Sequence, residues 1–112
     1  MNLLNETLES IKMSNHSITD IVFIGSKSGY TCSWKEFEKM ADKDYDKNFG
    51  APKVAQDLVI IFSDKQEMRR GEYDGSEWWE YSIPFQKPQK LLPITCLFAQ
   101  KIGWKNLSDI HE

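Results

Sequence analysis

Carboxylates and tryptophans, the residue types best suited to chemistry or recognition, gather in one short segment of this 112-residue chain. Four acidic residues lie in and around an Asp-Gly turn signal at 74–75: Glu72, Asp74, Glu77 and Glu80. Carboxylates that hold a divalent metal can support hydrolysis. An exposed tryptophan beside acids is instead typical of a protein-binding hot spot, and Trp78 directly follows Glu77. We favour binding of a protein partner, with a metal-dependent hydrolase using the carboxylates around 72–80 as the alternative.

A second acidic group alternates along the chain as Asp42, Asp44 and Asp46. This spacing is typical of the start of a calcium loop, which also needs glycine at its sixth position and glutamate at its twelfth. Those positions hold Lys47 and Lys53, which excludes calcium. We interpret the three acids as the exposed end of a helix, where negative charge opposes the helix dipole. Their unfavourable placement favours a role in recognising a partner.

Neither histidine is well placed for nucleophilic catalysis, which requires a base within hydrogen-bond reach of the nucleophile. His16 lies in a predicted loop, and His111 lies near the C-terminal end, where side chains are poorly fixed. The GSKSG segment at 25–29 lacks the spacing of a phosphate-binding loop, and we interpret it as a turn. We therefore expect a non-enzymatic protein with no catalytic residue, no cofactor and no metal.

The charge and cysteine content narrow the class of protein further. Fourteen Lys and Arg residues against 17 Asp and Glu residues give a net charge of −3, which argues against direct binding of nucleic acid. No apolar run approaches the roughly 20 residues of a membrane span, and the N-terminus lacks a secretion signal. Cys32 and Cys96 are therefore expected to be small buried thiols in a reducing cytoplasm.

Two main helices are predicted in the first half of the chain. The N-terminal segment 1–13 places apolar residues on one face at spacings of four and three: Leu4, Leu8 and Ile11. Ser33 and Glu36 form a capping box, in which each side chain satisfies a free backbone amide at a helix start. The second helix begins there, and its apolar spacing continues to Tyr45.

The sheet is predicted from short apolar runs bounded by turn residues. Segments 18–25 and 30–32 are expected to form one hairpin, and the nearly continuous apolar run 57–62 is typical of a central strand covered on both faces. Segment 68–73 is expected to be an edge strand broken by Gly71. The Asp-Gly turn then leads into a return strand at 77–83.

The predicted elements define the fold class. Alternation along the return strand places Trp79, Tyr81 and Ile83 on one face and Trp78, Glu80 and Ser82 on the other. Segment 94–99 is expected to be a last strand and 104–110 a short final helix. The sequence thus predicts a single α+β domain over 1–112, with an antiparallel sheet of four to six strands and its two main helices mostly on one face.

Several short motifs resemble a group of small uncharacterised proteins of phages and prophage-like elements of Gram-positive bacteria. The most specific is the Tyr-Asp-Gly-Ser-Glu-Trp-Trp run within 72–79. Further matches lie at 34–37, at 45–46 with 49–50, and at 55 with 57–60, and together the matches span about residues 20–110. The first helix lies outside the resemblance, and 63–70 departs from it. The resemblance implies a small phage-type accessory protein inside a bacterial cell and implies no activity.

Three hypotheses about function follow. The first is a non-enzymatic accessory protein that binds a host or phage protein through an acidic and aromatic surface. The second is the metal-dependent hydrolase. The third is a structural protein that forms homo-oligomers through a sheet edge at 68–73, because an unpaired edge can pair with a second copy.

Overall fold

The computed structural model describes residues 1–46, 51–82, 88–100 and 102–111, with only the backbone given for residue 82. A six-stranded sheet has the strand order β5-β4-β3-β1-β2-β6, and every neighbouring pair is antiparallel except β2 and β6. The strands are β1 (Ile21–Gly25), β2 (Tyr30–Thr31), β3 (Val59–Phe62), β4 (Glu67–Tyr73), β5 (Ser76–Ser82) and β6 (Leu92–Pro93). The helices are α1 (Leu3–Met13), α2 (Trp34–Ala41) and α3 (Leu107–Ile110), with a 3-10 turn at Ile18–Asp20. The predicted α+β class is confirmed.

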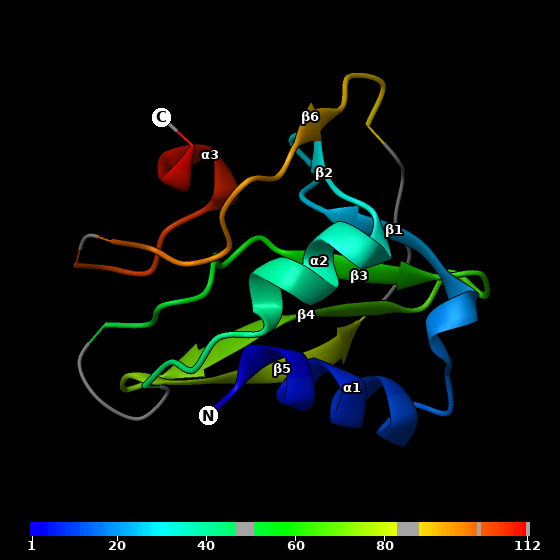
Figure 1. The fold of residues 1–112 in the computed structure, drawn as a ribbon, viewed down its shortest axis with the longest axis horizontal. Helices are drawn as coiled ribbons and strands as arrows, with labels where there is room; N and C mark the ends of the chain where they lie inside the picture. Colours follow the sequence, from blue (N-terminus) through cyan, green and yellow to red (C-terminus); the bar gives the residue numbers. More distant parts are fainter. Residues whose placement is uncertain (47–50, 83–87, 101, 112) are drawn as a thin grey trace.

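Both main helices cover the same face of the sheet, as Figure 1 shows. The main core beneath them joins Leu3 of α1 and Phe37 of α2 to Ile60 and Met68 of the sheet, and each of these four side chains is fully buried. Leu107 of α3 belongs to the same core. The predicted placement of the helices and of the short C-terminal helix is therefore confirmed.

The buried face of helix α1 differs from the predicted face. Leu4 and Leu8 are only half-buried, whereas Glu6 and Thr7 are buried with Leu3 and Ile11. The polar pair is buried because the sheet beneath offers hydrogen-bond partners to both side chains. A rule based on apolar spacing could not find this face.

Helix α2 begins as predicted and ends early. The Ser33 hydroxyl accepts a hydrogen bond from the Glu36 amide at 3.1 Å, and the Glu36 carboxylate accepts one from the Ser33 amide at 2.9 Å. The helix ends at Ala41, before the predicted Tyr45, because the next residues bond to the N-terminal segment. The Lys43 carbonyl accepts a hydrogen bond from the Leu3 amide at 3.2 Å. Asp44 and Asp46 therefore lie beyond the helix and not at its end.

Strand β3 is the predicted central strand, and all four of its residues are buried. Ile60 and Phe62 enter the main core beneath the helices, whereas Val59 and Ile61 join Phe23 in a second buried cluster. This strand pairs with β1 on one side and β4 on the other.

The β4–β5 hairpin forms at the predicted turn. Asp74 and Gly75 both have positive φ, at 53° and 87°, as a tight two-residue hairpin requires. The prediction that β4 is an edge strand is wrong, because β4 pairs with both β3 and β5. Strand β5 forms the edge of the sheet. Gly71 pairs with Trp78 within the ladder and does not interrupt it. A larger residue would not fit at this position, because a Cβ atom would lie 2.6 Å from the Trp78 indole nitrogen.

The predicted strand at 94–99 is wrong. Strand β6 lies just before it and pairs in parallel with β2, and the described part of 94–99 makes one isolated bridge, Val54 with Phe98. Separate hydrogen bonds to Lys53 and Ala55 replace a continuous ladder. Within the residues described, no helix is long and apolar enough to cross a membrane.

Candidate functional site

The hairpin tip exposes an aromatic and acidic surface. Tyr73 is 77% exposed and Asp74 is exposed, while Glu72 is half-buried. The Glu72 carboxylate accepts a hydrogen bond from the Gly75 amide at 3.0 Å, which fixes the turn. The tip therefore presents Tyr73 and Asp74 on a rigid hairpin.

Trp78 and Glu80 lie on the opposite face of β5 from Trp79 and Tyr81, as the alternation predicts. Trp79 and Tyr81 face α1, where their polar atoms donate to Thr7 Oγ1 at 3.0 Å and to the Ser10 carbonyl at 2.8 Å. On the other face, the half-buried Trp78 indole donates to the Glu80 carboxylate at 3.2 Å. The hydrogen bond to Glu80 thus fixes the Trp78 side chain, and only part of its ring is exposed at the surface.

Glu77 does not belong to the surface on which sequence reasoning placed it. Its side chain is fully buried, and its carboxylate accepts hydrogen bonds from the Lys53 amide at 2.6 Å and the Val54 amide at 3.1 Å. Arg70 contributes an ion pair at 3.1 Å. Glu77 therefore anchors the segment before β3 to the hairpin and is not available to a partner.

Asp42, Asp44 and Asp46 are exposed in the segment that follows α2. Between them, Tyr45 turns inward, and Arg70 of β4 donates to its hydroxyl at 3.0 Å. Figure 1 places this segment and the hairpin tip at the same end of the molecule. The structure thus brings the two acidic groups predicted from the sequence to one end of the fold.

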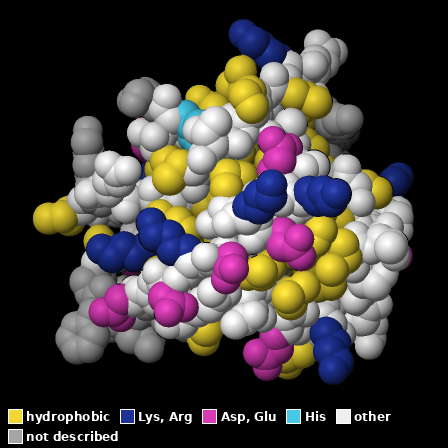
Figure 2. Space-filling model, in the orientation of Figure 1, with side chains coloured by type: hydrophobic (Ala, Val, Ile, Leu, Met, Phe, Trp, Pro, Cys, Tyr) yellow, Lys and Arg dark blue, Asp and Glu magenta, His cyan; other side chains and the backbone are white. Residues whose placement is uncertain are grey.

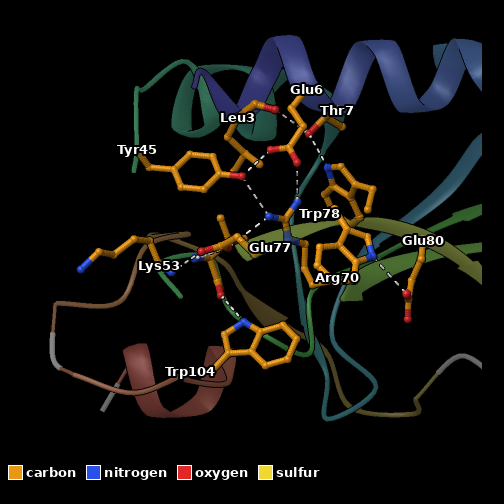
Figure 3. Close-up of polar contacts among 12 residues, drawn as sticks. Leu3, Glu6, Thr7, Tyr45, Lys53, Arg70, Glu77, Trp78, Glu80 and Trp104 are labelled. Carbon is orange, nitrogen blue, oxygen red and sulfur yellow. Dashed lines mark hydrogen bonds and ion pairs between the residues drawn. The ribbon is translucent and has the colours of Figure 1, made fainter. Parts of the chain in front are cut away.

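A buried polar cluster, Glu6, Tyr45, Arg70 and Glu77, lies between α1 and the hairpin (Figure 3). The Arg70 guanidinium is 3.5 Å from the Glu6 carboxylate and 3.1 Å from that of Glu77. The Tyr45 hydroxyl donates a hydrogen bond to Glu6. Burial raises the pKa of Tyr45 despite the opposing effect of Arg70, and the raised pKa keeps the hydroxyl protonated.

The arginine of this cluster also lies over the Trp79 ring, with 4.9 Å between the guanidinium carbon and the ring centroid. Among the residues that the structure describes, none forms a hydrogen bond with the Nε atom of Arg70. The cluster joins four parts of the chain that are far apart in sequence: α1, the segment after α2, the segment before β3, and the hairpin. Because all four side chains are buried, the cluster has a structural role. It fixes the sheet against α1 and against the segment after α2 that carries the exposed Asp42, Asp44 and Asp46.

Both histidines are fixed, which corrects the expectation of poorly ordered side chains. The His16 ring stacks on Phe62 at 3.9 Å and bridges Ser14 Oγ at 2.8 Å to Asp64 Oδ2 at 2.7 Å. This bridge holds the pKa of Asp64 below its ordinary value through the hydrogen bond from His16. His111 Nε2 accepts from the Thr95 amide at 2.9 Å.

Ser14, His16 and Asp64 form a hydrogen-bonded chain with the residue types of a hydrolase triad, but the Ser14 hydroxyl is not placed to act as a nucleophile. A nucleophilic serine must give its proton to the histidine. The Ser14 hydroxyl donates to the Ile11 carbonyl at 2.7 Å at the end of α1. We therefore interpret the chain as a connection between the end of α1 and the β3–β4 turn.

The hairpin carboxylates do not converge on one point. Glu72 caps the turn, Glu77 is buried beneath α1, and Glu80 lies on the opposite face of the sheet. Across the part of the chain that the structure describes, no group of three or more His, Cys, Asp and Glu side chains could hold a metal ion.

The thiols lie outside these clusters. Cys32 and Cys96 are unpaired with each other and only half-buried, so the expectation that both thiols are buried is wrong. Burial, with a smaller contribution from Glu36, raises the pKa of Cys32 to about 12. A thiol that stays protonated is a poor nucleophile, which gives Cys32 the character of a packing residue.

The described fold and surfaces define a small α+β protein with a mostly antiparallel sheet, covered by its two main helices on one face. Scans against protein-family models, curated proteins and solved structures find no match to this chain.

Proposed function

We propose that this chain is a small phage-type accessory protein of the bacterial cytoplasm that lacks catalytic activity and binds a protein partner. The binding surface is the hairpin-tip surface, which we define as Glu72, Tyr73 and Asp74 together with the exposed Asp42, Asp44 and Asp46. The phage-type origin is supported by the sequence motifs alone.

The observation that carries the proposal is the exposure of Tyr73 beside Asp74 at the end of a fully paired hairpin. Tyrosine offers a large amphipathic contact area, and a rigid hairpin presents it with little loss of entropy on binding. In Figure 2, several Asp and Glu side chains lie at the lower left, with basic side chains beside them, in the region where Figure 1 draws the tip. A partner with a basic surface fits this charge pattern.

The proposed surface differs from the predicted one in its central residues. Glu77 is buried and Trp78 is tied to Glu80 on the opposite face, so Tyr73 takes the place of Trp78 as the aromatic contact. Asp74 stays as its acidic neighbour.

Replacing Tyr73 by alanine and Asp74 by asparagine, which tolerates the positive φ of this turn position, is expected to weaken partner binding without unfolding the protein. The test is capture from bacterial lysate by the immobilised wild type, followed by titration of the purified captured protein. We expect the double variant to bind at least about 30-fold more weakly, which corresponds to about 2 kcal/mol at a hot spot.

The matched control is Ile102→Ala, because Ile102 is 90% exposed and lies outside the hairpin-tip surface. It should bind like the wild type. Equal affinity of the double variant and the wild type, or failure of any captured protein to bind in purified form, would contradict the proposal.

Homo-oligomerisation is the second candidate, and it now rests on β5 instead of β4. Strand β5 spans seven residues, Ser76–Ser82, and ends the sheet. A free edge can pair with a second copy. Under this alternative, sedimentation velocity should show a dimer that Tyr81→Pro converts to monomer, because the register places the Tyr81 amide on the side of β5 away from β4 and proline removes that amide. A wild type that stays monomeric up to about millimolar concentration argues against it.

A further inference from the structure

The two histidines bond to different kinds of group, and these partners fix where the ring protons lie. A neutral imidazole has one nitrogen that donates and one that accepts, whereas both nitrogens of an imidazolium donate. The β3–β4 turn, which bonds to His16, lies at the right of Figure 1, and α3, which His111 follows, lies at the upper left. The two rings therefore belong to separate parts of the fold.

His16 bonds at both ring nitrogens to groups that accept. Its side chain is 7% exposed, and Nε2 lies 2.7 Å from Asp64 Oδ2 of a carboxylate, which accepts when ionised. Nδ1 lies 2.8 Å from Ser14 Oγ. A hydroxyl has one proton, and Ser14 donates its proton to the Ile11 carbonyl at 2.7 Å. Both nitrogens of His16 therefore donate, which makes the ring an imidazolium.

The surroundings of the His16 ring suit a cation. The His16 amide donates to the Ile11 carbonyl at 3.1 Å, so the ring lies at the C-terminal end of α1, where the helix dipole favours positive charge. Asp64 supplies the opposite charge from the β3–β4 turn, and the Phe62 ring stacks on the imidazole. The other charged side chains described on these elements are Asp20, which caps the 3-10 turn, and the exposed Glu9, Lys12 and Lys65.

His111 has the opposite arrangement. Nε2 lies 2.9 Å from the Thr95 amide, which can only donate, so Nε2 accepts. Nδ1 lies 2.7 Å from the Leu107 carbonyl, which can only accept, so Nδ1 donates. One accepting and one donating nitrogen define a neutral imidazole with its proton on Nδ1. A second proton, on Nε2, would meet the Thr95 amide hydrogen and break that bond.

The groups around His111 are consistent with a neutral ring. The Tyr30 ring of β2 lies 4.6 Å away between centroids. Asp109, the acid on α3, is engaged elsewhere, because its carboxylate accepts a hydrogen bond from the Asn106 amide at 3.2 Å. The other titratable side chains described on the neighbouring segments are Lys90, Cys96 and Lys105.

We propose that the two histidines are complementary pH-sensitive connections. His16 joins the end of α1 to the β3–β4 turn only while its ring is protonated, and His111 joins α3 to the segment after β6 only while its ring is neutral. The stability that His16 contributes is therefore present at low pH and lost as the pH rises, and that of His111 is lost as the pH falls. Because one structure contains both connections, His16 keeps its proton at a pH at which His111 is neutral. Acidification releases the end of α3 first, while α1 stays attached until Asp64 is protonated.

The test is NMR of the ring nitrogens in the ¹⁵N-labelled full chain between about pH 5 and about pH 9. We expect an imidazolium at His16 and the Nδ1-protonated neutral form at His111 near about pH 7. His16 should lose its proton at a pH at least about one unit above that of His111. His111→Gln removes one set of signals and so assigns the other. Deprotonation of both rings at the same pH, or in the reverse order, would overturn the proposal.

Two variants test the partners of His16. Asp64→Asn should lower the pH at which His16 loses its proton by about one unit, whereas Asp44→Asn, the same change at an exposed position of the hairpin-tip end, should leave it unchanged. Ser14→Ala should also lower this pH, because it removes the acceptor of the Nδ1 proton. If Ser14 instead donated to a neutral ring, Ser14→Ala would raise this pH, and the proposal would be wrong.

The Thr95 amide tests the connection at His111, because its hydrogen bond requires the neutral ring. After correction for the intrinsic rate, its hydrogen exchange should accelerate at least about fivefold as His111 is protonated. The neighbouring Ile94 amide, which donates to the Thr31 carbonyl at 2.8 Å, is the control and should keep its protection. Equal protection of Thr95 with the protonated and the neutral ring would contradict the proposal.

Discussion

Replacing Arg70 by methionine is expected to destabilise the protein by about 3 to 5 kcal/mol. The side chain of Arg70 is fully buried, and its guanidinium contacts Glu6, Tyr45 and Glu77. Methionine has a similar apolar stem and removes the cation, so that two buried carboxylates lose the charge that compensates them. The free energy of unfolding in urea, monitored by tryptophan fluorescence, measures the effect.

The adjacent Arg69 is the matched control, because it lies on the same strand with half of its side chain exposed and forms an ion pair with Glu80 at 3.6 Å. Arg69→Met should change the free energy of unfolding by less than about 1 kcal/mol. Equal losses at the two positions would contradict the structural role of the cluster around Arg70.

A double-variant cycle tests whether Arg70 and Glu77 act as a pair. In the wild type, Glu77→Gln removes a charge that Arg70 compensates; in the Arg70→Met background it removes a charge that has lost its cation. The second change should therefore cost less than the first by about 1 kcal/mol or more. Strictly additive losses would show that the two side chains contribute independently.

Local signals in the sequence predicted the elements better than they predicted the polar interior. The capping box at Ser33 and Glu36, the apolar run of β3 and the Asp74-Gly75 turn each encode their structure within a few residues, and all three are confirmed. The sheet order and the two edges depend on pairings between distant segments. That is why β4 was wrongly predicted as an edge and β6 was missed.

The surface was harder to predict because acidic residues in this chain have two different uses. Glu77 and Asp74 are three residues apart in the same hairpin, yet one is fully buried and the other is exposed. The available signal was the strand period: Glu77 shares its parity with Trp79 and faces α1, where Arg70 stands opposite Trp79 in the ladder. Glu6 and Thr7 completed the arrangement from α1, and no local pattern links them to the hairpin.

Phe37→Ala is expected to destabilise the protein by about 3 to 5 kcal/mol, because the change removes a large side chain that is fully buried between α2 and the sheet. Phe37 stacks against Trp34 with 5.4 Å between ring centroids, and it belongs to the core that also holds Ile60 and Leu107. A cavity at this position cannot collapse easily, since its walls come from a helix capped at its start and from the centre of the sheet. Urea unfolding measures the loss.

Glu38→Ala serves as the control on the same helix, because Glu38 is exposed and alanine favours a helix. Its effect should stay within about 0.5 kcal/mol. The comparison tests the face of α2 directly: a helix turned by one residue would bury Glu38 and expose Phe37, and the two losses would then be exchanged. Losses of similar size at both positions would instead mean that α2 is not packed against the sheet, and the core beneath the helices would have to be reassigned.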